Sequence, residues 1–215
     1  VFYEFTNDSC CGKYTPLLLA CLEGHEATVS YLLEKGANVN AQTNSGDTGL
    51  MIACEANNLE LLIKFGPCID SRNLKGMTAL HSVCDSNGEE VVRLLIKYGA
   101  DIEARCFKGL TPLAHAVRRG DLNVVMELLK YEARIDTFDK YGYSPLYYAV
   151  LQDNIRIFEA LLEHAFTNFQ LICSTGILKF LRFSDISQLK FLRKFGIMMS
   201  SDSNFNELSA SRICY

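Results

Sequence analysis

A short apolar block that begins with Thr or Ser recurs along most of the chain. It reads TPLLLAC from Thr15, TGLMIAC from Thr48, TALHSVC from Thr78, TPLAHAV from Thr111 and SPLYYAV from Ser144, at intervals of 33, 30, 33 and 33 residues. A second apolar run follows each block and ends at Leu33, Ile63, Ile96, Leu129 and Leu162. Because apolar residues three and four apart mark one face of a helix, the pattern predicts two helices per unit.

Turn-forming residues occupy fixed places in each unit. Counting the Thr or Ser as position one, position ten holds residue types that tolerate a left-handed backbone and end a helix: Gly24, Asn57, Asn87, Gly120 and Asp153. Position twenty-two, which is position nineteen in the shortened second unit, repeats this stop signal in Gly36, Gly66 and Gly99, but not in Glu132 and Ala165. A further glycine lies two residues before four of the blocks, at Gly46, Gly76, Gly109 and Gly142. It predicts a hairpin that leads into a helix capped by the Thr or Ser.

This pattern resembles the ankyrin repeat, whose motif runs G-x-TPLHLA, then G-H, then V-V-x-LL-x-x-GA. The resemblance covers about Thr15 to Ala165. It implies an all-α ankyrin-repeat solenoid, in which stacked helix-turn-helix units are joined by β-hairpin-like loops. We expect five units, at about 15–47, 48–77, 78–110, 111–143 and 144–165.

The flanking segments carry weaker signals. Residues 1–14 are expected to be the remnant of a preceding repeat or an N-terminal cap. Residues 166–196 still show two amphipathic runs and predict a degenerate capping repeat, because a stack otherwise ends on an apolar face. Residues 197–215 predict a loosely ordered tail. The second unit is three residues short after Asn58, which predicts a late start of its second helix and a weak joint.

Composition narrows the function classes. The 215 residues carry 21 basic and 25 acidic side chains, and the formal charge of −4 gives no global attraction for nucleic acid. No apolar stretch approaches the roughly 20 residues of a transmembrane helix, so we expect no membrane insertion. The nine cysteines form no CxxC pair and no leader is recognised, which favours the cytoplasm, with the nucleus as an alternative. We expect a monomer.

Catalytic and metal-binding patterns were not found in the sequence. The four histidines are scattered over different units, and no GxSxG, HExxH or phosphate-binding glycine loop occurs. Cys21, Cys54 and Cys84 fall at position seven, where the family usually has Ala, and are expected to be small buried residues. The resemblance gives His81 a bracing role in its TPLH slot. We therefore expect no enzyme activity, no cofactor and no metal.

The resemblance also implies that a partner protein binds on a concave surface of hairpin tips and exposed faces of the first helices. The variable slots are acidic in the first three units, with Asp47, Glu55 and Asp85. They are basic and aromatic in units four and five, with Phe107, Lys108, Leu110, Arg118, Arg119, Lys140, Tyr141 and Tyr143. Aromatics beside arginines are typical of binding hot spots, so we expect docking mainly on units four and five. The alternative is that these are ordinary solvated tips.

Several specific roles stay open. The chain is expected to be a scaffold, adaptor or inhibitor. It could instead be the substrate-recognition part of a SOCS-box ubiquitin ligase, since Ala210, Ile213 and Cys214 fit the spacing of that box, although Ala210 replaces its leucine. A third alternative is a fragment of a larger ankyrin-bearing channel or latrotoxin-like toxin. Asn40, with Leu32 eight residues earlier, resembles the site where a cytosolic hydroxylase modifies ankyrin proteins.

Overall fold

Five pairs of helices make up the described part of the chain. The structure, a computed structural model, describes residues 14–56, 59–83 and 88–167. The pairs are α2 (Pro16–Leu22) with α3 (Glu26–Glu34), α4 (Gly49–Ala56) with α5 (Leu59–Lys64), α6 (Ala79–Ser82) with α7 (Gly88–Lys97), α8 (Pro112–Arg119) with α9 (Leu122–Lys130), and α10 (Pro145–Leu151) with α11 (Ile155–Thr167). No strand occurs in these ranges. The all-α repeat architecture predicted from the sequence is confirmed.

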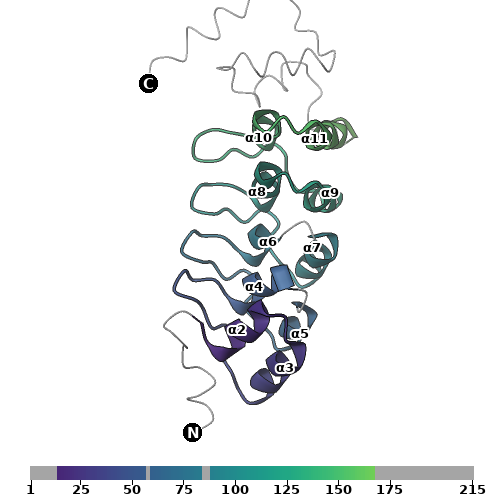
Figure 1. The fold of residues 1–215 in the computed structure, drawn as a ribbon. Helices are drawn as coiled ribbons and strands as arrows, with labels where there is room; N and C mark the ends of the chain where they lie inside the picture. The colour runs from purple at the N-terminus through teal and green to yellow at the C-terminus, as the bar shows by residue number, and fades with distance from the viewer. Residues whose placement is uncertain (1–13, 57–58, 84–87, 168–215) are drawn as a thin grey trace, which may run out of the picture. The chain divides into compact units, whose positions relative to one another are not determined.

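The helices form two layers. First helices of successive units pack on one another in one layer, and the second helices line up in the other (Figure 1). The hairpins project from the first-helix layer on the side away from the second helices (Figure 1). Each unit therefore contacts only its neighbours in the stack, as expected for a repeat protein.

Side-chain hydrogen bonds cap the N-termini of the first helices. The hydroxyls of Thr15, Thr48, Thr111 and Ser144 each accept a hydrogen bond from the backbone N–H three residues later, at 3.2 to 3.3 Å. Such N-caps satisfy amide groups that have no partner inside the helix. The third unit replaces this bond with a histidine, because the N–H of Thr78 donates to Nδ1 of His81 at 3.2 Å.

Residues with a left-handed backbone conformation follow several of the helices and end them. Gly120 caps α8 with φ 84°, and Asp153 has φ 52° after α10. Glu132 follows α9 with φ 60°, although glutamate gave no stop signal in the sequence. Ala165 makes no stop, since α11 continues to Thr167. The left-handed turns predicted at Asn57 and Asn87 lie outside the described residues.

The interior repeats in register with the units. Each first helix contributes a buried leucine at the same position of its unit: Leu17, Leu50, Leu80, Leu113 and Leu146. The second helices of the later four units contribute Leu62, Leu95, Leu128 and Leu161. Cys21 and Cys54 are buried cysteines outside any disulfide, and burial raises the pKa of Cys21 to about 11. They act as small core residues, while Cys84 lies outside the described range.

The second and third units are the least regular. Helix α5 has six residues, against nine in α3 and α9, which agrees with the shortened sequence of unit two. Helix α6 has four residues, and Val83 after it is extended, with φ −61° and ψ 133°. The sequence did not predict this short α6. The unit limits proposed above stay predictions, and the segments before Tyr14 and after Thr167 lie outside the described residues.

Candidate interaction surface

Four hairpins share one backbone geometry. In each, the residue three before the glycine donates its N–H to the carbonyl of the residue after it. These bonds join Thr43 to Asp47, Asn73 to Met77, Cys106 to Leu110 and Asp139 to Tyr143, at 2.9 to 3.0 Å. The glycines at the turns have φ between 72° and 81°. Glycine adopts this left-handed conformation without steric cost, so the hairpins follow directly from the sequence.

The two residues before each glycine form what we call the tip row: Asn44, Ser45, Leu74, Lys75, Phe107, Lys108, Lys140 and Tyr141. Successive tips are joined through the backbone. The N–H of Leu74 donates to the carbonyl of Ser45 (2.9 Å), that of Phe107 to Lys75 (3.0 Å) and that of Lys140 to Lys108 (3.0 Å). A Cβ on Gly109 would lie 2.9 Å from the nitrogen of Lys140, so glycine is needed for this approach. The backbone fixes the tip row, and its side chains are free to vary.

Large apolar side chains stand out from successive tips. Leu74 is 70% exposed, Phe107 60% and Tyr141 61%. The lysines of the tip row, Lys75, Lys108 and Lys140, are exposed as well. The first described tip, by contrast, presents only Asn44 and Ser45. The tip row therefore changes from uncharged and polar to cationic and apolar along the stack.

The residue after each hairpin glycine is buried or half-buried. Leu110 is 1% exposed, and its carbonyl accepts a hydrogen bond from Nε2 of His81 at 3.1 Å. We therefore remove Leu110 from the predicted surface, because a buried side chain cannot contact a partner. Asp47 is half-buried and accepts from Nδ2 of Asn73 (2.7 Å) and from the Ser45 hydroxyl (2.5 Å). It braces two neighbouring hairpins.

A tyrosine cluster supports the last described tip. The rings of Tyr143 and Tyr147 stack, with centroids 4.1 Å apart and planes 9° apart. Tyr148 meets both rings edge-on, with centroids 6.1 Å from Tyr143 and 5.9 Å from Tyr147. The Tyr148 hydroxyl donates to Oδ2 of Asp139 at 2.6 Å, and Oδ1 of Asp139 accepts from the N–H groups of Tyr141 and Tyr143 at 2.8 Å. Burial, aided by this bond to Asp139, raises the pKa of Tyr148.

Sequence reasoning missed this support. Tyr147 fills the slot of the TPLH histidine, and Asp139 fills the slot of Asn73, which accepts the matching pair of backbone bonds in the second hairpin. Those two positions were the available signals. The cluster orders Tyr143, which is half-buried, and leaves Tyr141 as the exposed ring.

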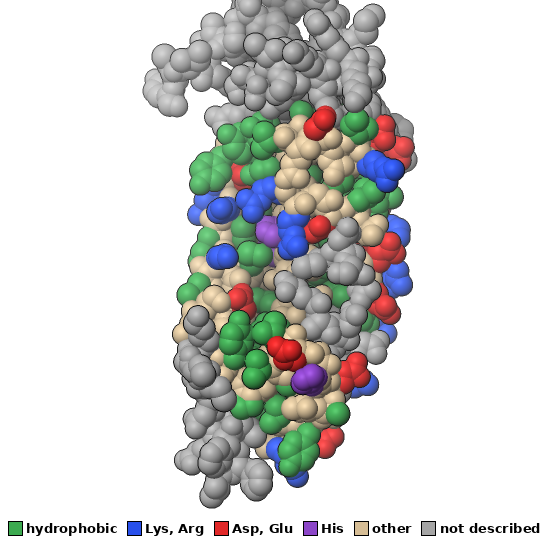
Figure 2. All heavy atoms as spheres, in the orientation of Figure 1, with side chains coloured by type: hydrophobic (Ala, Val, Ile, Leu, Met, Phe, Trp, Pro, Cys, Tyr) green, Lys and Arg blue, Asp and Glu red, His purple; other side chains and the backbone are tan. Residues whose placement is uncertain are grey.

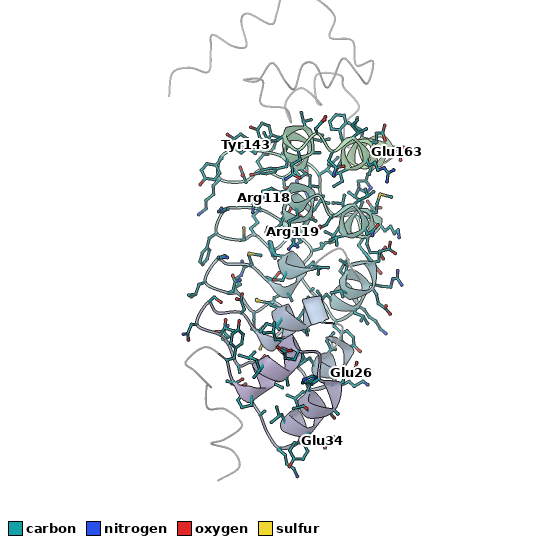
Figure 3. All side chains as sticks on the ribbon, in the orientation of Figure 1. Glu26, Glu34, Arg118, Arg119, Tyr143 and Glu163 are labelled. Carbon is teal, nitrogen blue, oxygen red and sulfur yellow. The ribbon has the colours of Figure 1, made fainter. Side chains whose placement is uncertain are left out.

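Basic side chains lie beside the tips, on the last turn of α8. Figure 3 places Arg118 and Arg119 there and Tyr143 one unit further along. Nε of Arg119 is 3.0 Å from Oδ2 of Asp121, an intrachain ion pair. Buried His115 lies under this charge: burial first, and then the charges of His81, Arg118, Arg119 and Lys108, lower its pKa to about 4. Figure 2 shows Lys and Arg side chains gathered around a histidine on the face in view.

The acidic half of the predicted groove gains no support. Asp47 is used inside the fold, the side chain of Glu55 lies outside the described part, and so does Asp85. The reversal of charge along the surface stays a prediction.

Asn40 is likewise engaged between units. Its Oδ1 accepts from the N–H of Cys68 at 2.8 Å. The same kind of link recurs further along, where Asp70 accepts from the N–H of Asp101 (3.1 Å) and Glu103 from that of Arg134 (2.8 Å). Asn40 thus has a bracing role in the turns, and its hydroxylation stays a prediction from the sequence.

The two buried histidines, His81 and His115, contribute to the fold. His81 and His115 meet edge-on with ring centroids 6.1 Å apart, and His81 spans Thr78 and Leu110 through its two nitrogens. Because the Thr78 N–H donates to Nδ1, the neutral ring carries its proton on Nε2. Within the residues that the structure describes, no three His, Cys, Asp or Glu side chains are placed to share a metal ion. In the same ranges, no helix has the length and apolarity that crossing a bilayer requires.

Comparison with known proteins connects this geometry to a family. A family model described as ankyrin repeats in three copies matches residues 17–106 and 103–171. The chain is 38% identical over 87 residues to the probable E3 ubiquitin-protein ligase XBOS33 of Oryza sativa subsp. japonica, covering 39% of the chain and 17% of that protein.

Two Drosophila melanogaster proteins are also similar. Identity to the ankyrin repeat and KH domain-containing protein mask is 56% over 39 residues, covering 18% of the chain and 1% of that protein. Identity to transient receptor potential cation channel subfamily A member 1 is 33% over 79 residues, covering 35% and 7%. The chain thus spans at most 17% of the length of these relatives.

Proposed function

The chain belongs to the ankyrin-repeat family, whose members use their stacks as protein-protein interaction modules, and from this premise we propose that its partner docks on the tip row and first helices of units four and five. The residues that would contact the partner are Phe107, Lys108, Arg118, Arg119, Lys140 and Tyr141. Tyr143 would support them from its stack on Tyr147.

The observation that carries this proposal is the set of apolar side chains on neighbouring tips. Leu74, Phe107 and Tyr141 are each at least 60% exposed, and backbone bonds hold their tips side by side. Single exposed apolar residues are ordinary, but a contiguous group edged by charge is typical of an interaction site. A row of rigid tips also loses little conformational entropy on binding.

Alanine substitution tests the placement. We expect Phe107→Ala and Tyr141→Ala each to weaken binding to a partner recovered by pull-down about tenfold or more, because aromatic anchors dominate interface energies. Tyr98→Ala is the matched control, since Tyr98 is 49% exposed but follows α7 in the second-helix layer. Unchanged affinity for both tip variants, with circular dichroism showing intact helices, would contradict the placement.

The proposed role is that of a scaffold, adaptor or inhibitor that binds rather than catalyses and needs no cofactor. Ankyrin repeats are non-catalytic interaction modules, which supports this reading. We propose that the chain acts as a monomer in the cytoplasm, with the nucleus as the alternative, since its nine cysteines form no CxxC pair. Light scattering of the purified chain tests the monomer, and imaging of the tagged chain tests the compartment.

A second candidate is the recognition part of a ubiquitin ligase. Its support is the similarity to a protein named as a probable E3 ubiquitin-protein ligase, of which the chain matches a small part. The SOCS-like residues Ala210, Ile213 and Cys214 lie outside the described residues. A full-length transcript separates the candidates, because the ligase reading requires a SOCS or similar box downstream and the channel or toxin reading requires many more repeats or a membrane segment.

A further inference from the structure

We propose that the partner segment held on this surface is an acidic, extended stretch of polypeptide, whose carboxylates pair with Lys108, Arg118 and Lys140. We call these three residues the basic platform. An apolar side chain of the segment would pack between them on Phe107 and Tyr141. The inference rests on the proposed function and adds the chemistry of the partner.

The carboxylates near the basic platform are already engaged. Asp121 pairs with Arg119 at 3.0 Å. Asp139 accepts three hydrogen bonds, from the Tyr148 hydroxyl and from two backbone N–H groups. In the described part of the chain, no ion pair joins a carboxylate to a residue of the basic platform.

Uncompensated positive charge here is notable because the whole chain carries a formal charge of −4. A local positive patch on an acidic protein selects for negative partners and rejects positive ones. The lowered pKa of His115 reports the same patch, since the charges of Lys108 and Arg118 contribute to it after burial.

The spacing of the units suits an extended chain. Helices of neighbouring units pack about 8 to 10 Å apart, and an extended chain advances about 3.3 Å per residue. About three residues therefore cover one unit. A segment of about six residues spans the two steps from the Leu74 tip to the Tyr141 tip, and about nine residues cover the three units. Side chains of such a segment point alternately toward and away from the surface, so every second side chain contacts the protein.

Single-stranded nucleic acid fits less well. Sequence-tolerant binding of nucleic acid uses aromatic faces that are free to stack on bases. The faces of Tyr143 and Tyr147 are turned to each other at 4.1 Å, and Tyr148 is 8% exposed. Tyr141 and Phe107 remain, on separate tips, which suits apolar side chains of a peptide better than a continuous column of bases.

A displayed library of random peptides of about nine residues tests the proposal. The library is selected on three proteins: the unsubstituted chain, a platform variant with Lys108→Gln, Arg118→Gln and Lys140→Gln, and a control with Lys64→Gln, Lys97→Gln and Arg156→Gln. The control removes the same charge from exposed side chains on second helices or their ends. Circular dichroism checks that all three are folded.

We expect the peptides recovered on the unsubstituted chain to be enriched in Asp and Glu. The affinity of the tightest peptide should fall about tenfold on the platform variant and stay unchanged on the control, because each of three partly exposed ion pairs contributes about a twofold effect. Its affinity should also fall as salt is raised, since salt screens exposed charges.

The other outcomes distinguish failure of the acidic segment from failure of the proposed docking surface. Peptides without acidic enrichment that nevertheless lose affinity on Phe107→Ala would overturn the acidic segment and leave the proposed function standing. Peptides insensitive to both the platform and Phe107→Ala would overturn both. Failure to recover any peptide, or tighter retention of a random single-stranded oligonucleotide than of any peptide, would overturn the acidic segment as well.

Discussion

The first and last described hairpin tips have the same backbone geometry but side chains that differ in charge, size and apolar character. Asn44 and Ser45 are small and uncharged, whereas Lys140 and Tyr141 supply a cation and an exposed ring, yet both hairpins close with the same hydrogen bond at 2.9 to 3.0 Å. The second helices that follow the two hairpins differ too, because α5 after the first hairpin has six residues and α11 after the last has thirteen. The repeat thus keeps its shape through glycines and caps, and two residues per tip are left for recognition.

The largest effect should come from the core. Leu62 and Leu128 are equivalent, fully buried leucines in units two and four. We expect Leu128→Ala to cost about 4 kcal/mol of unfolding free energy and Leu62→Ala about 2 kcal/mol, because the short α5 should close more easily around the cavity. Urea denaturation measures both. Equal losses of unfolding free energy would show that unit two, despite its shorter helix, does not relax around a cavity more easily than unit four.

Acid should affect the units unequally. In the described residues the buried histidines are His81 and His115, in units three and four, while His25 in unit one is exposed. Their folded-state pKa values are lowered below 6.5, to about 4 for His115, first because of burial. A lowered histidine pKa means that the folded state binds fewer protons, so this stability is present above pH 6.5 and is lost as the pH falls toward about 4.

For His115 the loss amounts to about 3 kcal/mol, from about 1.4 kcal/mol per unit of pKa. Thermal melting between pH 7 and pH 4 measures it, and His115→Leu should flatten the dependence. Amide exchange at pH 4 should rise in α8 before it rises in α2. Unfolding that begins in the first unit would contradict this order.

A smaller effect on stability should distinguish a glycine packed against the next tip from a glycine with open space around it. Gly109 and Gly66 both have positive φ, at 81° and 66°. A Cβ at Gly109 would collide with the next tip, whereas a Cβ at Gly66 would meet no atom within 4 Å. We expect Gly109→Ala to cost about 2 kcal/mol and Gly66→Ala about 1 kcal/mol, the latter from backbone strain alone. Thermal denaturation tests the difference, and equal costs would mean that contact between tips is unimportant.

Local features were predictable from the sequence. Glycines set the hairpins, Thr and Ser set the N-caps, and the missing residues after Asn58 shortened α5, because each of these signals acts within a few residues. The short α6 was not predicted. The close packing of Gly88 was not predicted either, since a Cβ there would collide with the side chain of Val124. That close approach of α7 to α9 depends on packing between units.

The surface was only partly predictable for the same reason. Leu110 and Asp47 occupy slots that vary within the family, but contacts with His81 and Asn73 turn them inward. Arg118 and Arg119 look alike in the sequence, and only the structure shows that Arg119 is paired with Asp121. Such partners lie in other units or beyond a turn, where spacing along the chain says little about direction.

Giving the later tips the sequence of the first tip tests the central claim most directly. This exchange variant carries the Asn-Ser of the first tip in place of the residues of the two later tips, with Phe107→Asn, Lys108→Ser, Lys140→Asn and Tyr141→Ser. The measurement is the dissociation constant of its complex with the partner recovered by pull-down. Because the hairpin backbones match, helicity should be retained while affinity falls about a hundredfold. A folded exchange variant that binds the partner as tightly as the unsubstituted chain would contradict recognition by these tips.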